Sequence, residues 1–290
     1  YLRIVYGSDV ADEALFIRHS YLASLAKLMV WCRFTDSDHH PDDQELLAIL
    51  RGTYFHDHLS IENFLEEDFF SWVAREEARG AGLRVARMVL ELLRSYNLRE
   101  LSEDVLKALY EGLVDPATRH DLGEYYTPDW LAHRVVRKLL GRNPRASLLD
   151  PACGSGTFLY MAIREKRQRL GNSARTLRHI ESSVVGMDVH PLACIIAKTN
   201  YLLAIGELMG KRKRPFTIPI YLANSIRPPE EDMVLLKGVK CFRAEIDGET
   251  VYLAGRLMED PPKHDEAMNA AREFAEAWKD RDAANAAVET

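Results

Sequence analysis

The chain has 290 residues, of which 47% are hydrophobic and 28% charged, and its formal net charge at pH 7 is −6. This is the composition of an ordinary soluble globular protein, long enough for two domains. The acidic balance argues against a protein that binds DNA over its whole surface, but it leaves room for a local basic face.

The cysteines are scattered and form no Cys-x-x-Cys motif, which argues against a zinc site or a disulfide framework and favours a reducing cytoplasm. No apolar run approaches the roughly 18 residues of a membrane span, and no signal peptide opens the chain. We therefore expect a cytoplasmic protein without a membrane partner. Because the chain begins with Tyr1 rather than Met, we expect it to be part of a longer protein. The cysteines are Cys32, Cys153, Cys194 and Cys241.

The first part of the chain, residues 1–121, is predicted to be an all-helical domain because apolar residues recur there at helical spacing. A polar stretch at 36–43 predicts a loop. Ser102 is placed to cap the last helix, and acidic residues follow it in the first turn. The predicted helices span 12–34, 61–76, 83–96 and 103–113.

The pattern changes from Thr127 onward, where strands and helices alternate. Thr127 can cap a helix that has Pro128 in its first position and ends at Gly141. The alternation predicts an α/β fold with a doubly wound parallel sheet, whose ligands bind at the carboxyl ends of the strands. The predicted strands span 147–150, 183–188 and 218–223, and the predicted helices between them span 157–169 and 191–209.

A hairpin is predicted after this sheet, with strands over 241–246 and 249–253 joined by the turn Asp247-Gly248. Residues 264–288 are rich in Ala and Glu and predict a terminal helix. We place the boundary between the helical domain and the second domain at 121/122, so that the second domain covers 122–290.

A glycine-rich stretch, Asp150-Pro151-Ala152-Cys153-Gly154-Ser155-Gly156-Thr157-Phe158-Leu159, lies between a predicted strand and a predicted helix. This is the context in which a glycine-rich loop binds a nucleotide-like cofactor. A dinucleotide site would have a third glycine where Leu159 stands, and its acid about 20 residues further on. Here Asp150 already sits at the strand tip, where it can meet a cationic group. S-adenosylmethionine carries two such groups, an ammonium and a sulfonium.

This stretch strongly resembles the cofactor motif of amino-methyltransferases, above all the DNA N6-adenine methyltransferases of type I or IIG-like restriction–modification systems. Three further motifs follow the order of that family: Gly123–Pro128 resembles a companion cofactor motif, Val185–Pro191 the second strand with its ribose-binding acid, and Ile220–Ser225 the third strand. The resemblance implies a Rossmann-like methyltransferase sheet, present here in part, that binds S-adenosyl-L-methionine.

The resemblance also implies roles for single residues. Asp150 would accept hydrogen bonds from the methionine ammonium, and Asp188 would take the ribose hydroxyls with Val189 against the adenine ring. Asn224 stands where the family usually has an acid that accepts from the adenine amino group, and its amide oxygen can also accept. The implied cofactor residues are Tyr126, Thr127, Asp150, Ala152, Cys153, Gly154, Ser155, Gly156, Thr157, Phe158, Asp188, Val189 and Asn224.

Plainer readings stand beside these roles. Thr127 can be a helix cap and Asp188 a capping acid, and both can hold together with ligand binding. Cys153 invites a reading as a nucleophile, but without a basic neighbour it more readily packs as a small apolar residue. The basic run Lys211–Arg214 could meet DNA phosphates or be a solvated loop.

The histidine pairs His39-His40 and His56-Asp57-His58 lack helical ligand spacing and cysteine partners, so we interpret them as solvated loops and assign no metal site.

The family's catalytic motif, Asn or Asp followed by Pro-Pro and an aromatic residue, is not found, since the nearest string is Asp260-Pro261-Pro262-Lys263. We assign no catalytic residue and expect that this chain alone does not methylate DNA. The whole enzyme is expected to act on double-stranded DNA, with a fused or partner nuclease or recognition domain. N4-cytosine, RNA or protein-glutamine methylation, a non-catalytic cofactor-binding subunit and a nicotinamide dehydrogenase remain alternatives.

Overall fold

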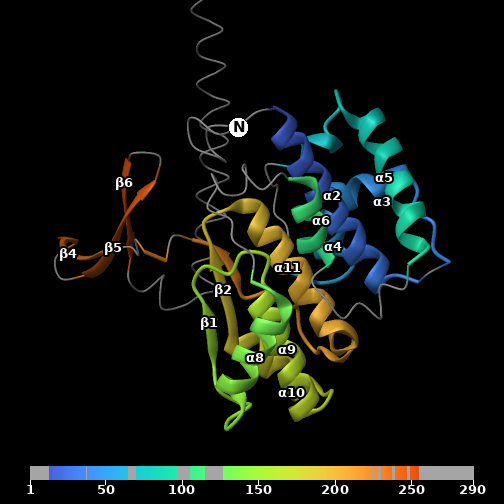
Figure 1. Ribbon diagram of the computed structural model, residues 1–290. Coiled ribbons are helices and arrows are strands. Elements are labelled where there is room, and N and C mark those ends of the chain that lie inside the picture. The colour runs from blue at the N-terminus through green and yellow to red at the C-terminus, as the bar shows by residue number, and fades with distance from the viewer. Residues whose placement is uncertain are drawn as a thin grey trace, which may run out of the picture. The chain divides into compact units, whose positions relative to one another are not determined.

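The computed structural model describes residues 13–36, 38–64, 70–96, 105–114, 127–223, 225–226, 230–236, 239–246 and 249–254. They fall into two compact units, residues 1–225 and residues 226–290. Figure 1 shows the elements of both units. The predicted boundary at 121/122 lies outside the described residues and stays a prediction.

The amino-terminal part of the first unit is a layer of helices built around one long helix, α2. Three of the four predicted helices are confirmed, by α2, α5 and α6. The prediction missed α3, although Asp42 caps its start by accepting from the Glu45 amide at 2.8 Å. The layer contains α2 (Glu13–Phe34), α3 (Asp43–Arg51), α4 (Thr53–Asp57), η1 (Ser71–Ala74), α5 (Arg79–Arg94) and α6 (Val105–Leu113).

The predicted helix over 61–76 is wrong. Ile61 instead forms a parallel bridge with Phe216, and among the described residues 61–64 and 70–76 the only helical segment is a short 3-10 helix, Ser71–Ala74. The described apolar residues Ile61, Phe64 and Phe70 are buried. The residues on either side of Ile61 bond to a distant partner, because the Phe216 N–H donates to the Ser60 oxygen and the Glu62 N–H donates to the Phe216 oxygen. Tertiary pairing therefore overrides the local pattern here.

Helix α2 is a core helix whose burial extends to a charged side chain. Leu22 and Leu28 are fully buried, and Trp31 is 1% exposed. Lys27 is also 1% exposed, and its ammonium donates to the Leu50 carbonyl oxygen at 2.6 Å, near the end of α3. A cation at that place satisfies a helix-end carbonyl that would otherwise lack a partner.

The rest of the first unit is a three-stranded parallel sheet with helices, in the order β1-β2-β3. The three predicted strands and the helices between them are confirmed, whereas α10, capped by Ser173, was missed. Pro128 rather than Thr127 is the residue that caps α8, so the Thr127 cap is wrong. The elements are α8 (Asp129–Leu140), β1 (Leu148–Asp150), α9 (Thr157–Leu170), α10 (Ala174–Ser183), β2 (Val184–Asp188), α11 (Pro191–Ile205), η2 (Gly206–Lys211) and β3 (Ile220–Leu222).

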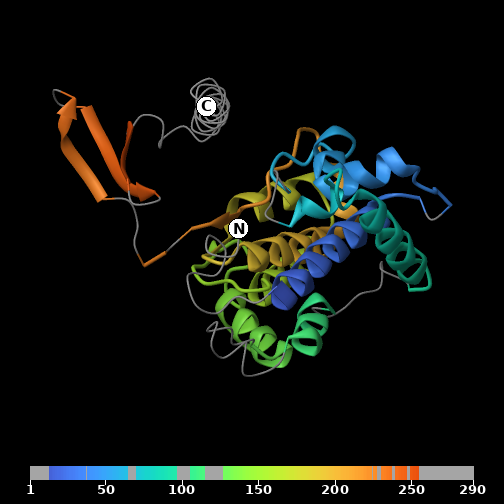
Figure 2. The same cartoon turned by 90° about the horizontal axis from the view of Figure 1, so that it is seen from above.

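Helix α11 joins the two parts of this unit, because it packs against α2 on one side and against α9 and the sheet on the other (Figure 2). Together with η2 it forms a run, Pro191–Lys211, that is long and apolar enough to cross a membrane by length and composition. From the sequence we expected no apolar run of membrane-spanning length. Its 18-residue window is 83% buried inside the protein, as in the central helix of a globular core.

A second connection between the two parts is a seam, defined here as residues 60–63 paired with residues 216–218. Phe216 N–H donates to the Ser60 oxygen at 2.9 Å beside the bridge to Ile61. The Asn63 side chain donates to the Ile218 oxygen at 2.9 Å and accepts from the Ile218 N–H at 2.7 Å. The helical layer is therefore hydrogen-bonded to the chain just before β3.

The second unit contains a three-stranded antiparallel sheet, β4 (Glu230–Leu236), β5 (Val239–Ile246) and β6 (Glu249–Ala254), in the order β4-β5-β6. The predicted hairpin is confirmed, with Ile246 opposite Glu249. Strand β4 was missed. The turn residues 247–248 and the predicted helix 264–288 lie outside the described residues.

Candidate functional site

The glycine-rich loop follows β1 and turns at once into α9, at the carboxyl end of the parallel sheet. The loop is tied to the next strand, because the Cys153 N–H donates to the Met187 oxygen at 2.8 Å. A tight turn follows, in which the Gly156 N–H donates to the Cys153 oxygen at 2.8 Å. Gly154 and Gly156 have φ of +53° and +81°, a left-handed backbone that favours glycine.

Gly156 is required for packing as well as for backbone shape. A Cβ atom at this position would lie 3.1 Å from both the Cα and the Cβ of Ala197 on α11. The start of α9 can approach α11 this closely only without a side chain. The loop geometry is thus fixed by the helix beneath it.

Asp188, at the end of β2, is bound to the loop through both carboxylate oxygens. Oδ2 accepts from the Gly154 N–H at 2.8 Å, and Oδ1 accepts from the N–H of His190 at 2.9 Å. His190 is the N-cap residue of α11, so Asp188 binds an amide at the start of this helix although it is not itself the capping residue. Each oxygen keeps a second lone pair with which it can accept from a ligand.

Asp150, at the end of β1, has a carboxylate that is only partly satisfied. Its Oδ1 accepts from the Ala152 N–H at 3.3 Å, whereas Oδ2 is buried and has no hydrogen-bond partner among the described residues. Burial raises the pKa of Asp150, and the negative charge of Asp188 raises it further, while the bond from Ala152 lowers it. A positively charged donor at this place would bond to Oδ2 and would stabilise the ionised form of the buried carboxylate.

The side chains of Ser155 and Thr157 face inward. Their hydroxyls lie 3.1 Å apart, and both residues are buried. Asn200 on α11 donates to the Ser155 oxygen at 2.9 Å. Sequence reasoning missed Asn200, whose only signal was an amide within an apolar helix. The loop therefore offers a ligand its backbone groups rather than these hydroxyls.

Cys153 is buried, with a side chain beneath β2, where a Cβ at Gly186 would lie 3.1 Å from its sulfur. Burial raises the pKa of the Cys153 thiol, and neighbouring Cys194 and Asp188 raise it further. The reading of Cys153 as a packed apolar residue is confirmed. Phe158 likewise packs, half-buried, against the core.

The remaining predicted residues lie at the rim or outside the described chain. Val189 is 64% exposed, which leaves an apolar side chain open next to Asp188. The Thr127 oxygen accepts from the buried ammonium of Lys107 on α6 at 3.1 Å, and that ammonium also contacts the Asp129 carboxylate. Tyr126 and Asn224 lie outside the described residues.

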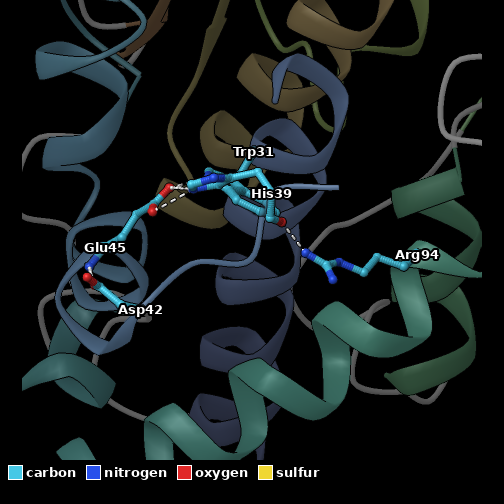
Figure 3. Close-up of polar contacts among 5 residues, drawn as sticks. All are labelled: Trp31, His39, Asp42, Glu45 and Arg94. Carbon is cyan, nitrogen blue, oxygen red and sulfur yellow. Dashed lines mark hydrogen bonds and ion pairs between the residues drawn. The ribbon is translucent and has the colours of Figure 1, made fainter. Parts of the chain in front are cut away.

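The histidine pairs are held by their own neighbours. His39 lies 2.8 Å from the Glu45 carboxylate, which also accepts from the Trp31 indole N–H at 3.2 Å, and Arg94 donates to the His39 oxygen (Figure 3). His56 contacts Asp57 at 2.9 Å. In the part of the chain that the structure describes, no three His, Cys, Asp or Glu residues are grouped as metal ligands.

Three cations of the basic run 211–214 make internal contacts. Lys211 donates to the Asn172 oxygen at 2.5 Å, and Arg214 pairs with Glu181 at 2.7 Å. Arg212 donates to the Leu59 oxygen at 2.7 Å, next to the seam. These contacts give the run a structural role at the base of β3.

Comparison with known proteins finds relatives for part of this chain. A family model for the N-6 DNA methylases matches residues 101–232. The methylase subunit of type I restriction enzyme MjaVII from Methanocaldococcus jannaschii is 28% identical over 162 residues, which are 54% of this chain and 24% of that protein. The MjaIX methylase subunit of the same organism is 31% identical over 116 residues, 39% of this chain and 19% of that protein.

This chain thus spans about a quarter or less of the length of these relatives. Among solved structures, a DrdV–DNA complex matches with a TM-score of 0.42 at 18% identity, over 74% of this chain and 24% of that chain. That score is too low to compare architectures. The family model and the relatives agree with the motifs over residues 123–225. Over residues 101–232, the chain is similar to the N-6 DNA methylases, and it resembles the methylase subunits of type I restriction enzymes.

Proposed function

We propose that this chain is the S-adenosylmethionine-binding portion of a cytoplasmic DNA adenine-N6 methyltransferase from a restriction–modification system. The observation that carries the proposal is the buried Oδ2 of Asp150, which has no partner among the described residues. A buried acceptor beside a second carboxylate calls for a cationic donor, and the methionine ammonium is one.

The neighbouring residues fit the rest of the cofactor. Asp188 keeps lone pairs for the ribose hydroxyls, and the exposed Val189 offers an apolar surface to the adenine ring. The left-handed turn at Gly154 and Gly156 lets a ligand approach the backbone. Thr127, with Tyr126 and Asn224, completes the proposed site.

The arrangement of strands supports the same proposal. Parallel strands in the order β1-β2-β3, with the glycine-rich loop after the first, are the arrangement expected for one half of a Rossmann-like sheet. A nicotinamide dinucleotide would bring its anionic pyrophosphate to this loop, where Asp150 and Asp188 already gather negative charge. The electrostatics therefore favour a cationic cofactor.

In the whole enzyme, the cofactor supplies an activated methyl group, and the proposed acceptor is N6 of an adenine flipped out of double-stranded DNA. The chain's own residues bind and orient the cofactor. The Asn/Asp-Pro-Pro-aromatic motif is not in this sequence. We accordingly propose that the rest of the enzyme binds the acceptor base and supplies the nuclease or recognition partner.

Calorimetric titration of the 290-residue chain with S-adenosylmethionine tests the cofactor assignment. Asp150→Asn removes the charge that would bind the ammonium, and Asp188→Ala removes the ribose contact. Loss of one charge-assisted hydrogen bond is worth about 1.5–3 kcal/mol, or roughly 10–150-fold in affinity. Asp57→Asn, at a carboxylate that is 61% exposed and outside the site, is the control.

We expect the wild type and Asp57→Asn to bind equally, and both site variants to bind weakly or not at all. Folded wild-type chain that fails to bind S-adenosylmethionine, or binds NADH instead, would refute the assignment. The acceptor is tested separately: a nucleoside digest of DNA methylated by the full-length enzyme should contain N6-methyladenine. N4-methylcytosine in that digest would favour the alternative reaction.

A further inference from the structure

Two buried histidines from distant parts of the sequence meet next to the candidate cofactor site. His19 lies on α2 in the helical layer and is 0% exposed. His190 lies between β2 and α11. Their rings meet edge to face, with centroids 5.6 Å apart and planes at 88°. The pair is a direct contact between the helical layer and the loop that follows β2.

His190 is joined to the candidate site through its backbone. Its N–H donates to Asp188 Oδ1 at 2.9 Å, and the other oxygen of Asp188 accepts from Gly154 at 2.8 Å. A displacement of His190 would therefore turn the carboxylate proposed to hold the ribose, and would disturb the glycine-rich loop with it.

His19 is itself held firmly in the helical layer. The Phe70 ring packs edge-on against it, with centroids 6.3 Å apart, and Phe16 packs on Phe70 at 5.8 Å. This aromatic cluster leaves the His19 ring little freedom to move away from His190. The contact is consequently well suited to fix the position of the loop.

Both rings are neutral at physiological pH. Burial lowers the pKa of His19 to about 3, with the nearby charges of His190 and Arg18 acting in the same direction. Burial lowers the pKa of His190 to about 4, although Asp188 opposes the shift. Two neutral rings can pack in contact without the repulsion that two imidazolium ions would bring.

We propose that His19 is a positioning residue for the cofactor site, which acts by holding His190 so that the His190 amide orients the Asp188 carboxylate. The proposal rests on the proposed function and deepens it, because it gives the helical layer a part in cofactor binding. The helical layer then sets cofactor affinity without touching the cofactor.

The test compares two substitutions at His19 with a matched control on the same helix. His19→Ala removes the ring, and His19→Phe restores an aromatic ring without the nitrogens. Leu28→Ala also truncates a fully buried side chain of α2, about 13 Å further along the helix, and so matches the loss of core packing.

Two quantities are measured on the 290-residue chain: its affinity for S-adenosylmethionine by calorimetry, and hydrogen exchange of the His190 amide in the ligand-free protein. The exchange rate is taken relative to the amide of Tyr201, a buried residue of α11, the helix that His190 precedes. This ratio separates local opening at His190 from a general loss of stability.

We expect His19→Ala to weaken binding about tenfold, the lower end of what loss of an outer-shell partner costs at metal sites, and to speed exchange at His190 relative to Tyr201. His19→Phe should restore both quantities, and Leu28→Ala should change neither. The proposal is overturned if His19→Ala leaves the exchange ratio unchanged, or if Leu28→Ala reproduces both effects. A wild type that does not bind the cofactor would overturn the proposed function and the cofactor part of this proposal. A changed exchange ratio would in that case still show that His19 holds the His190 amide.

Discussion

The glycines of this protein allow a graded test of how the loop is built. Gly156 has a φ of +81°, and an added Cβ would lie 3.1 Å from Ala197. Gly154 has a φ of +53°, with no atom within 4 Å of an added Cβ. Gly210, in η2, has neither a positive φ nor a neighbour within 4 Å. Substitution by alanine therefore tests backbone strain together with crowding at Gly156, backbone strain alone at Gly154, and neither effect at Gly210.

The expected costs follow from these geometries. A left-handed backbone costs an L-residue about 1–2 kcal/mol, and inserting a methyl group into a packed contact typically costs about 1–3 kcal/mol. Gly154→Ala should lower the free energy of unfolding by about 1 kcal/mol, and Gly156→Ala by about 2–4 kcal/mol. Gly210→Ala should be neutral or slightly stabilising, because it restricts the unfolded chain.

Urea unfolding, followed by tryptophan fluorescence, to which the buried Trp31 contributes, measures all three variants under the same conditions. The order of midpoints should be Gly210→Ala, then Gly154→Ala, then Gly156→Ala, from highest to lowest. The reasoning fails if Gly156→Ala unfolds at the same urea concentration as Gly210→Ala. It also fails if Gly154→Ala is the most destabilised, because strain would then outweigh the contact with α11.

Three further predictions concern ionisable groups. The pKa values of His19 and His190 are lowered from 6.5 to about 3 and about 4, so the unfolded chain binds protons that the folded chain does not. The free energy of unfolding should therefore fall as the pH is lowered from about 6.5 to 4. His19→Phe should make this fall shallower by up to about 1.4 kcal/mol per pH unit, as measured by urea unfolding at each pH. Burial lowers the pKa of Lys166 from 10.5 to about 8, so the folded chain releases that proton first. Wild-type stability should then rise from pH 8 to 10.5 relative to Lys166→Met, and an identical pH dependence would contradict this. Cys153, with its raised pKa, should react with iodoacetamide far more slowly in the folded chain than in urea, as mass spectrometry of the labelled peptide would show, and Cys153→Ala should change cofactor affinity less than about twofold.

The sequence predicted the elements whose local signals agree with their surroundings. The helix over 12–34 and the strand over 183–188 have apolar patterns that match their burial, and both are present. The segment 61–76 is also rich in apolar residues, yet Ile61 pairs with Phe216 across the molecule. That pairing depends on a partner far away in the chain, which local periodicity cannot reveal.

The candidate site was predicted in part. The convergence of Asp150 and Asp188 follows from the parallel strands that carry them, and the structure brings both to the glycine-rich loop. The contribution of Asn200 could not be predicted, because an amide within an apolar helix gives no indication of its partner. The contact between His19 and His190 was missed for the same reason, since it depends on how α2 lies against α11.

The seam between residues 60–63 and 216–218 sets an order for events during protein synthesis. Asn63 and its partner Ile218 are 155 residues apart in the chain. At the usual rates of translation, the second segment is made roughly 8–30 s after the first. Throughout that interval the growing chain carries helical-layer residues whose partner has not yet been made. The amide of Asn63 can complete its two bonds only after Ile218 has emerged from the ribosome, so the helical layer is synthesised first but completed late.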